Sequence, residues 1–472
     1  MAIAVVAAAT LGLAFLLYHL CFSLFISPLT KIPVSLNSTS ALRIMYGAGS
    51  AFERTSFYNI FHAYAKSAML KGANAAIVEA KIRQYLDLIA RQEGSNEIFA
   101  SLHYFSLDTM TDFLYGKYGK TSCLEGSEAD RALVDDIVDV ARRRLSWFTV
   151  HLPRYTAWLY SWTGLFGKVA RGSYPMQLPN TYTGVRRHVM IACQEFARSP
   201  AAYDLCESVE QTPPLIAKLW KNHYSRKTGG LDDVDIASGC ADHLLAGIDT
   251  TSDALMFFIW SLSQPESNRS QQKLVGEVRS ISQENLNAHH IPNVEASDKL
   301  PYVNAVIKET LRLYAPLPAP EPRKAPTATV IDGYRIPAGT TVSILPYTLY
   351  RNLKVFLDIM QFNTDRWMDP SQNTVEISRW FLAFLVEAEC ALDSKMTRLV
   401  AAVYRKYTTT TICDIDIVSP GIISRYEMFY DEGCGGVKVS FGFHYYCTKM
   451  KALPSHDISQ EHIHFNTLNW GI

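Results

Sequence analysis

The chain has 472 residues, of which 48% are hydrophobic and 12% aromatic, and this composition excludes a disordered protein. Its 45 Lys and Arg balance its 45 Asp and Glu, so it lacks the basic excess of a nucleic-acid-binding protein, and we expect no nucleic-acid partner. The nine cysteines are scattered and form no C-x-x-C pair. This pattern argues against a disulfide framework or a zinc cluster and indicates free thiols in a reducing compartment.

The first predicted element is a membrane-spanning helix. Residues 2–26 contain no Asp, Glu, Lys or Arg, and about 20 such residues span the apolar core of a bilayer as a helix. A cleaved signal peptide is the alternative, although the run is long for one and no basic residue precedes it. Lys31 follows the run, so the positive-inside rule places the body in the cytoplasm. We expect residues 1–27 to be a single-pass transmembrane anchor and residues 28–55 to be a shortened linker.

The next stretch, from Ser56 to about Pro316, has its apolar residues mostly at helical spacing. Residues 231–262 contain no proline and have one long apolar face, which predicts a helix long enough to cross the domain. Near the middle of this helix, residues 246–251 read AGIDTT. A glycine, a carboxylate and two hydroxyls in an otherwise apolar helix suggest a widened groove able to pass protons. A packing glycine beside a solvated aspartate is the alternative.

A pair of oppositely charged residues follows at Glu309 and Arg312. Their i,i+3 spacing places them on one helix face, where an exposed pair would contribute only a few tenths of a kcal/mol. Arg366, in the segment FNTDRWMDP, is a further arginine. It would close a Glu–Arg–Arg network if the three side chains met in the interior.

The pattern changes in the last third of the chain. Residues 327–345 alternate β-forming residues around an Asp-Gly pair, which predicts a strand, a turn and a second strand. A helical pattern returns at 391–407, and the tail, residues 414–472, is irregular apart from a predicted strand at 437–441. The sequence therefore predicts a mainly α fold with a small β portion (α+β).

In this order and spacing, these segments resemble the cytochrome P-450 family, the haem-thiolate monooxygenases, and most of all its fungal microsomal members. AGIDTT is similar to the family's A-G-x-D-T-T on the distal helix, and KETLR is similar to its E-x-x-R. The anchor followed by SPLTKIP, and the segments YRNLKVF, FNTDRWMDP and SRWFLAF, extend the similarity. It covers residues 56–384 and 396–407.

The resemblance implies a P-450-like domain over residues 56–413, a location in the endoplasmic reticulum membrane, and a haem cofactor. It also implies electrons from NADPH through NADPH-cytochrome P-450 reductase and an apolar small-molecule substrate. The fungal members suggest secondary metabolism and, as a substrate class, terpenoids such as trichothecenes. The site residues that the resemblance carries over are Asp249 and Thr250 for proton delivery, Ala246 and Gly247 facing the substrate, and Glu309, Arg312 and Arg366 as an internal structural network.

The haem-binding loop departs from the family pattern, F-x-x-G-x-R-x-C-x-G, in which a cysteine thiolate binds iron and an arginine meets a propionate. Here the stretch is FLVEAECAL, with Glu389 at the arginine position and Ala391 at the cysteine position. Cys390 comes one residue early, and a slip of about 3.8 Å far exceeds the tolerance of a metal–ligand bond, about 0.2 Å. The apolar residues of this stretch recur at helical spacing, and the helix that they predict places Cys390 on the side opposite its apolar face. We therefore expect an ordinary helix cysteine, and only a weak candidate ligand for haem iron.

A second departure lies between residues 33 and 58, where the family's W-x-x-x-R helix and several strands have no counterpart, so we expect an incomplete fold. Three interpretations remain open. The chain is an inactive homologue of the family, or an active haem-thiolate monooxygenase that uses Cys390 or the glycine-flanked Cys434 as iron ligand. The third interpretation is a non-catalytic, membrane-anchored scaffold.

Overall fold

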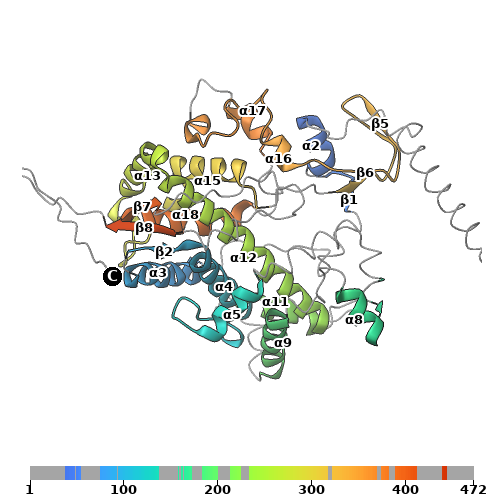
Figure 1. Ribbon diagram of the computed structural model, residues 1–472, viewed down its shortest axis with the longest axis horizontal. Helices are drawn as coiled ribbons and strands as arrows, with labels where there is room; N and C mark the ends of the chain where they lie inside the picture. Colours follow the sequence, from blue (N-terminus) through green and yellow to red (C-terminus); the bar gives the residue numbers. More distant parts are fainter. Residues whose placement is uncertain are drawn as a thin grey trace, which may run out of the picture.

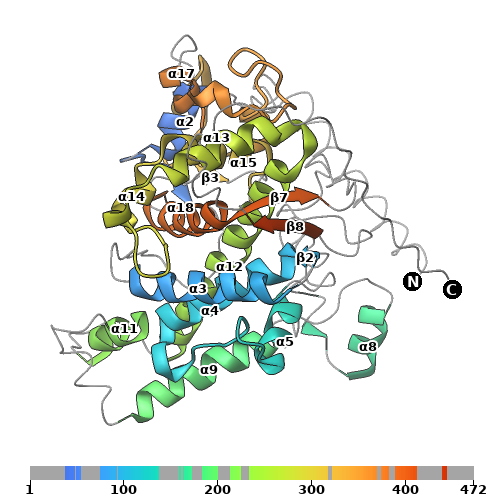
Figure 2. The same ribbon diagram turned by 90° about the vertical axis from the view of Figure 1, so that its left-hand side faces the viewer.

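The structure is a computed structural model organised around the long helix α12, Asp233–Ser263, which crosses the middle of the molecule (Figure 1). Helix α4, Ile98–Tyr115, packs along α12, and helix α3, Ala75–Arg91, packs on α4 (Figure 2). The described residues are 38–47, 49–54, 75–92, 94–137, 158, 161–162, 164–172, 183–199, 213–224, 233–316, 322–368, 374–381, 389–411 and 438–443.

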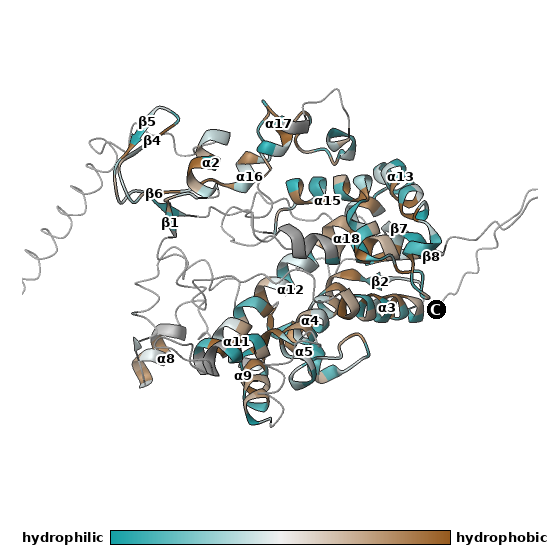
Figure 3. Ribbon diagram, turned by 180° about the vertical axis from the view of Figure 1, so that it is seen from behind, coloured by the Kyte–Doolittle hydropathy of each residue, from teal (hydrophilic) through white to brown (hydrophobic). Residues whose placement is uncertain are grey.

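Helix α12 is central because much of its sequence is apolar on every side. Residues 254–259 are all fully buried, as expected for a helix that is hydrophobic all round. The predicted helix over 231–262 is confirmed, with a start at Asp233 and an end at Ser263. Figure 3 shows hydrophobic segments on α4 and α12, whereas α13 is largely hydrophilic.

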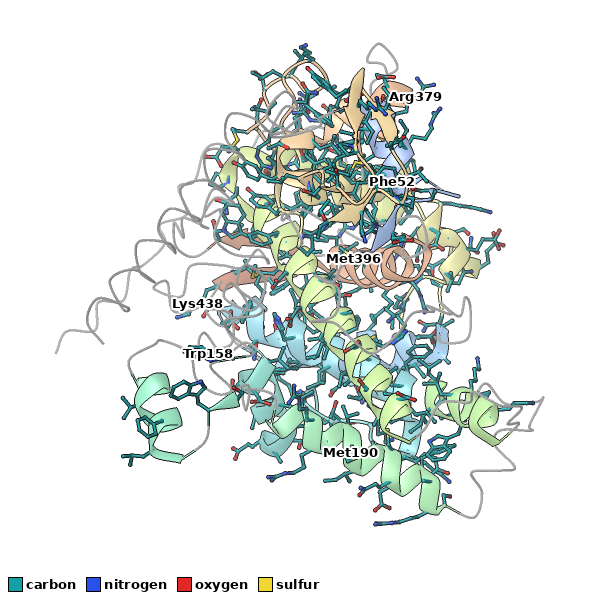
Figure 4. The ribbon with its side chains drawn as sticks, turned by 90° about the vertical axis from the view of Figure 1, so that its right-hand side faces the viewer. Phe52, Trp158, Met190, Arg379, Met396 and Lys438 are labelled. Atoms are coloured by element: carbon teal, nitrogen blue, oxygen red, sulfur yellow. The ribbon has the colours of Figure 1, made fainter. Side chains whose placement is uncertain are left out.

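The other helices surround this central group, and the predicted helix at 391–407 is confirmed as α18. They are α2 (Thr39–Tyr46), α5 (Glu128–Ile137), α8 (Gly164–Gly172), α9 (Thr183–Arg198), α11 (Leu215–Tyr224), α13 (Asn268–Arg279), α14 (Val294–Asp298), α15 (Pro301–Leu313), α16 (Pro346–Leu349), α17 (Thr374–Arg379) and α18 (Glu389–Lys406). Short 3-10 turns lie at η4 (Gly116–Tyr118), η5 (Pro265–Ser267), η6 (Gln283–Asn285) and η7 (Thr364–Trp367). Figure 4 shows Met396 of α18 beside α12, and this side chain is fully buried.

The described strands form three small antiparallel sheets. The first has the order β1-β3-β6, with β1 at Glu53–Arg54, β3 at Arg323–Lys324 and β6 at Thr341–Val342. The second has the order β2-β8-β7, with β2 at Asn96–Glu97, β7 at Tyr407–Thr411 and β8 at Lys438–Phe443. The third is the hairpin of β4 (Thr329–Ile331) and β5 (Tyr334–Ile336).

The hairpin confirms the strand-turn-strand prediction near 327–345. Its two turn residues, Asp332 and Gly333, both have positive φ angles, 50° and 83°. Two residues in this left-handed region match the right-handed twist of the flanking strands, and Asp-Gly is one of the few pairs that accept it. The fold is thus mainly helical with a small β portion, as predicted.

The segment predicted as a linker, residues 28–55, contains more structure than expected. Ser38 caps α2 by accepting a hydrogen bond from the backbone N–H of Ala41, at 2.9 Å. One face of α2 is buried against the hairpin region, so apolar packing gives this short helix its stability. The adjacent β1 joins the first sheet, although it has only two residues.

No helix within the described ranges is both long and apolar enough to cross a membrane. The predicted anchor, residues 1–27, lies outside those ranges. β8, in contrast, shows that part of the segment predicted as a divergent tail pairs with the body of the protein.

Candidate functional site

Two of the predicted site residues, Ala246 and Thr250, lie one helical turn apart on the same side of α12. Ala246 is exposed and Thr250 is partly buried. The Thr250 hydroxyl donates a hydrogen bond to the Ala246 carbonyl, with an O···O distance of 2.6 Å. This back-bond to the preceding turn is the one expected from the sequence, and it commits the hydroxyl to the backbone of its own helix.

Gly247 faces a different direction from its neighbour. A Cβ atom built at this glycine would lie 2.6 Å from Cε and 2.7 Å from Sδ of Met110 on α4. Each residue turns a helix by about 100°, so Gly247 points toward α4 while Ala246 faces the open side. The resemblance assigned both residues to the substrate side, but in this structure Gly247 is a close-packing residue between two helices.

Asp249 also points toward α4. Its Oδ1 atom lies 3.9 Å from Nε2 of His103, and Oδ1 of Asp253, one turn further along α12, lies at the same distance from that nitrogen. The side chain of Asp249 is 13% exposed. The candidate proton-delivery acid is therefore held in a polar cluster between the two helices.

Glu309, Arg312 and Arg366 come together in the interior with almost no exposure. Nη2 and Nε of Arg312 donate to the two oxygens of Glu309, each at 2.9 Å, which is a bidentate ion pair. Nε of Arg366 donates to Oε1 of the same carboxylate at 3.1 Å. The single carboxylate of Glu309 thus neutralises part of the positive charge of the two buried guanidinium groups.

Further donors complete the coordination of Glu309. The backbone N–H of Asn363 donates to Oε1 and the indole N–H of Trp367 donates to Oε2, both at 2.9 Å. The remaining guanidinium N–H groups of the two arginines donate to backbone carbonyls of the segment 350–361. This network ties α15 to the irregular segment before η7. The spacing of Glu309 and Arg312 predicted the pair, whereas the tryptophan and the carbonyls carried no sequence signal.

Cys390 is the second residue of α18, which begins at Glu389. Its side chain, the preceding residues 382–388 and Cys434 lie outside the part of the chain that the structure describes. Within the described ranges, no group of three His, Cys, Asp or Glu side chains is arranged to hold a metal ion.

Three cysteines within the described ranges are free and buried: Cys123, Cys193 and Cys240. Burial, together with the neighbouring Asp108, raises the pKa of the Cys123 thiol far above its ordinary value. The pKa of Cys240 is also raised, by a hydrogen bond with Cys193 and by burial. Cys123 and Cys240 therefore resist forming the thiolate that binds metals, and all three cysteines are buried core residues.

Comparison with known proteins identifies the family. The family model of cytochrome P-450 matches residues 53–384, which is more than half of the chain. The chain belongs to the cytochrome P-450 family. The network of Glu309 and its two arginines lies within the matched region of this P-450.

Curated relatives of this P-450 include fungal monooxygenases. The cytochrome P-450 monooxygenase orf2 of Aspergillus niger is 33% identical over 211 residues, which cover 44% of this chain and 36% of the relative. The monooxygenase cpaH of Aspergillus oryzae is 27% identical over 281 residues, 59% of this chain and 48% of the relative. The inactive cytochrome P-450 monooxygenase cloA of Claviceps fusiformis is 32% identical over 199 residues, 41% of this chain and 36% of the relative. The chain thus spans less than half the length of each.

Haem is the prosthetic group of this family, and the residues around the start of α18 do not fit a thiolate-bound haem. Because α18 begins at Glu389, the backbone of Cys390 follows a helix instead of the open loop that brings a thiolate to iron. The sequence also places carboxylates, Glu387 and Glu389, where the family has a glycine and the propionate-binding arginine. A carboxylate repels a propionate, so Glu389 supplies the wrong charge for that contact, and the helical backbone at Cys390 differs from the open loop of the family.

Proposed function

We propose that this P-450 is an inactive homologue of the fungal monooxygenases of secondary metabolism, which keeps the ion-braced core and does not hold haem through a thiolate. The observation that supports this proposal is the start of α18 at Glu389, which includes Cys390 in its first turn. The substitution of the loop glycine and arginine by glutamates points the same way.

The ancestral activity belongs to the same proposal. An active member would insert one oxygen atom into an apolar small molecule, with electrons from NADPH through a reductase, and terpenoids such as trichothecenes are the substrate class that we propose. One fungal relative is itself named an inactive cytochrome P-450 monooxygenase. Loss of haem would leave Asp249 and Thr250 without the reaction that their positions serve in the family.

The test is a reduced, carbon monoxide-bound difference spectrum of the purified full-length protein, expressed with haem supplied. We expect no Soret band at the wavelength that gives the family its name. A matched variant restores the family pattern in the loop by replacing Glu387 with Gly, Glu389 with Arg, Ala391 with Cys and Asp393 with Gly.

The active interpretation makes the opposite prediction. A Soret band in the unmodified protein that Cys390→Ala abolishes would overturn the proposal, and a band that survives Cys390→Ala but not Cys434→Ala would assign the ligand to the tail. Bound haem with a band at the position of a histidine-ligated protein would separate haem retention from thiolate ligation.

A further inference from the structure

A lysine amine lies in apolar surroundings between α4 and α18. It belongs to Lys395 of α18, whose Nζ is 3.2 Å from Sδ of Met110 and 5.9 Å from the centre of the Phe113 ring, both on α4. The next residue, Met396, lies beside α12 (Figure 4). Met110 also occupies the space in front of Gly247, so the amine is one side chain away from the middle of α12. Lys395 therefore lies where α4, α12 and α18 meet.

No anion balances this amine. Among the residues that the structure describes, no carboxylate forms an ion pair or a hydrogen bond with Lys395. The charged groups on the neighbouring helices have partners of their own: Lys81 lies 3.6 Å from Asp112, and Arg398 lies 3.2 Å from Glu79. A thioether is a weak hydrogen-bond acceptor and a phenyl ring attracts a cation only through its face, so neither replaces a carboxylate.

Surroundings of this kind favour the neutral amine over the ammonium. Burial lowers the pKa of Lys395 to about 8, so about 10% of the molecules carry the free amine at pH 7. A lysine with the ordinary pKa of about 10.4 is less than about 0.1% free amine at the same pH. Only the free amine has the lone pair that attacks a carbonyl carbon. The side chain of Lys395 is partly exposed, so a small molecule can reach it.

The side chains around the amine select the molecule that it meets. Met110 and Phe113 offer a thioether and an aromatic ring, and both of these pack favourably against another aromatic ring. Neither side chain offers a charge or a strong hydrogen-bond donor to a carboxylate or a phosphate. An uncharged aromatic aldehyde fits these surroundings, because its ring packs on the two side chains while its carbonyl carbon reaches Nζ.

We propose that Lys395 is a nucleophile that captures uncharged aromatic aldehydes as imines at the junction of α4, α12 and α18. Nζ adds to the carbonyl carbon to give a carbinolamine. Loss of water then leaves a C=N bond, and the carbonyl oxygen departs with the two hydrogens of the amine. No electrons are transferred, so the reaction needs no oxidant or reductant and is distinct from that of a monooxygenase.

Reductive trapping measures the reaction. Full-length protein is incubated at pH 7 with benzaldehyde and sodium cyanoborohydride, which reduces an imine to a stable amine, and peptide mapping by mass spectrometry locates the modified lysines. We expect Lys395 to be modified at least tenfold faster than Lys354, which is exposed. Lys81, which is buried but paired with Asp112, should stay unmodified. The ratio of the two rates should fall as the pH rises to 10, because ordinary exposed amines then lose their protons too.

A matched pair of variants and a matched aldehyde complete the test. Lys395→Met should abolish the fast modification, whereas Lys354→Met should leave it unchanged. Relative to Lys354, 4-formylbenzoate should modify Lys395 more slowly than benzaldehyde does, because its carboxylate would have to leave water for an apolar site. The proposal is overturned if Lys395 reacts no faster than Lys354 in the unmodified protein, a result that does not depend on how any variant folds. Equal relative rates with the two aldehydes would also overturn it.

Discussion

Among single residues, Glu309 combines complete burial with five hydrogen bonds from four residues. Such a carboxylate contributes to stability through its partners, because each buried cation needs an anion close by. The two arginines keep their carbonyl contacts when Glu309 is removed, but carbonyl dipoles do not neutralise two positive charges.

We therefore predict that Glu309→Ala lowers the free energy of unfolding by about 3–5 kcal/mol, as for other buried ion pairs that lose one partner. Urea unfolding followed by circular dichroism measures this change in the free energy of unfolding. The control is Glu295→Ala, which removes an exposed glutamate paired with Lys299 at 2.6 Å and should leave the unfolding midpoint unchanged. An equal effect of both substitutions would contradict the role of the buried network.

Lys395 gives a pH-dependent prediction. Burial against Met110 and Phe113 lowers the pKa of its ammonium to about 8, below the ordinary value near 10.4. The folded protein then binds this proton less tightly than the unfolded chain, so burying the charged ammonium lowers the free energy of unfolding. This loss of stability is complete below pH 8 and disappears as the pH rises from 8 toward 10.4. Lys395→Met should stabilise the protein at pH 7 and have a smaller effect at pH 10.

Thermal unfolding of the two proteins across this pH range tests the prediction. Lys299→Met removes an exposed lysine and should give a difference from the wild type that shows no step between pH 8 and 10. A pH-independent effect of Lys395→Met would mean that lost or gained packing, not charge, dominates at this position.

At the scale of the elements, the contact between α4 and α12 depends on Gly247. Alanine there brings a methyl group within 2.6 Å of Met110, an overpacking cost of about 2 kcal/mol, against a gain in helix propensity of about 1 kcal/mol. We predict that Gly247→Ala lowers the free energy of unfolding by about 1 kcal/mol, measured by urea unfolding.

A matched glycine provides the control. Gly276 lies within α13, and a Cβ built there meets nothing within 4 Å, so Gly276→Ala should stabilise the protein by about 1 kcal/mol. Replacing Met110 with Ala should turn the effect of Gly247→Ala from destabilising to stabilising. A stabilising effect of Gly247→Ala in the unmodified protein would show that Met110 moves aside without cost.

The elements also show what sequence reasoning could reach. Periodicity predicted α12 and α18 to within two residues at their ends, and the Asp-Gly pair predicted the β4–β5 turn, because these signals are local. The i,i+3 spacing predicted the pair of Glu309 and Arg312 for the same reason.

Contacts between distant segments left no local signal. His103 meets Asp249 only because α4 packs on α12, and the side of α12 that Gly247 faces is set by that packing as well. Helical phase shows which residues share a face of a helix. Only the tertiary fold decides what each face contacts.

At the scale of the whole molecule, the proposed location is testable by fractionation. The uncharged run at residues 2–26 leads us to predict that full-length protein expressed in yeast sediments with microsomes and resists carbonate extraction. A variant that begins at residue 28 should lose this resistance. Recovery of the full-length protein in the soluble fraction, or cleavage near residue 27, would contradict the anchor.

β8 has a consequence for how the chain folds during its synthesis. It lies between β2 and β7 and pairs with both, so neither outer strand has this partner until the C-terminal part of the chain has been made. Asn96 and Val439 are about 340 positions apart, and at 5–20 residues per second a ribosome needs on the order of half a minute to cover that distance. For most of this interval only β2 lacks its partner, because β7 is made shortly before β8, and an unpaired strand edge is the kind of surface on which chains associate wrongly. β8, the last of the described strands, therefore completes this sheet, and a polypeptide released between Thr411 and Lys438 would leave the edges of β2 and β7 open to chaperones and to other chains.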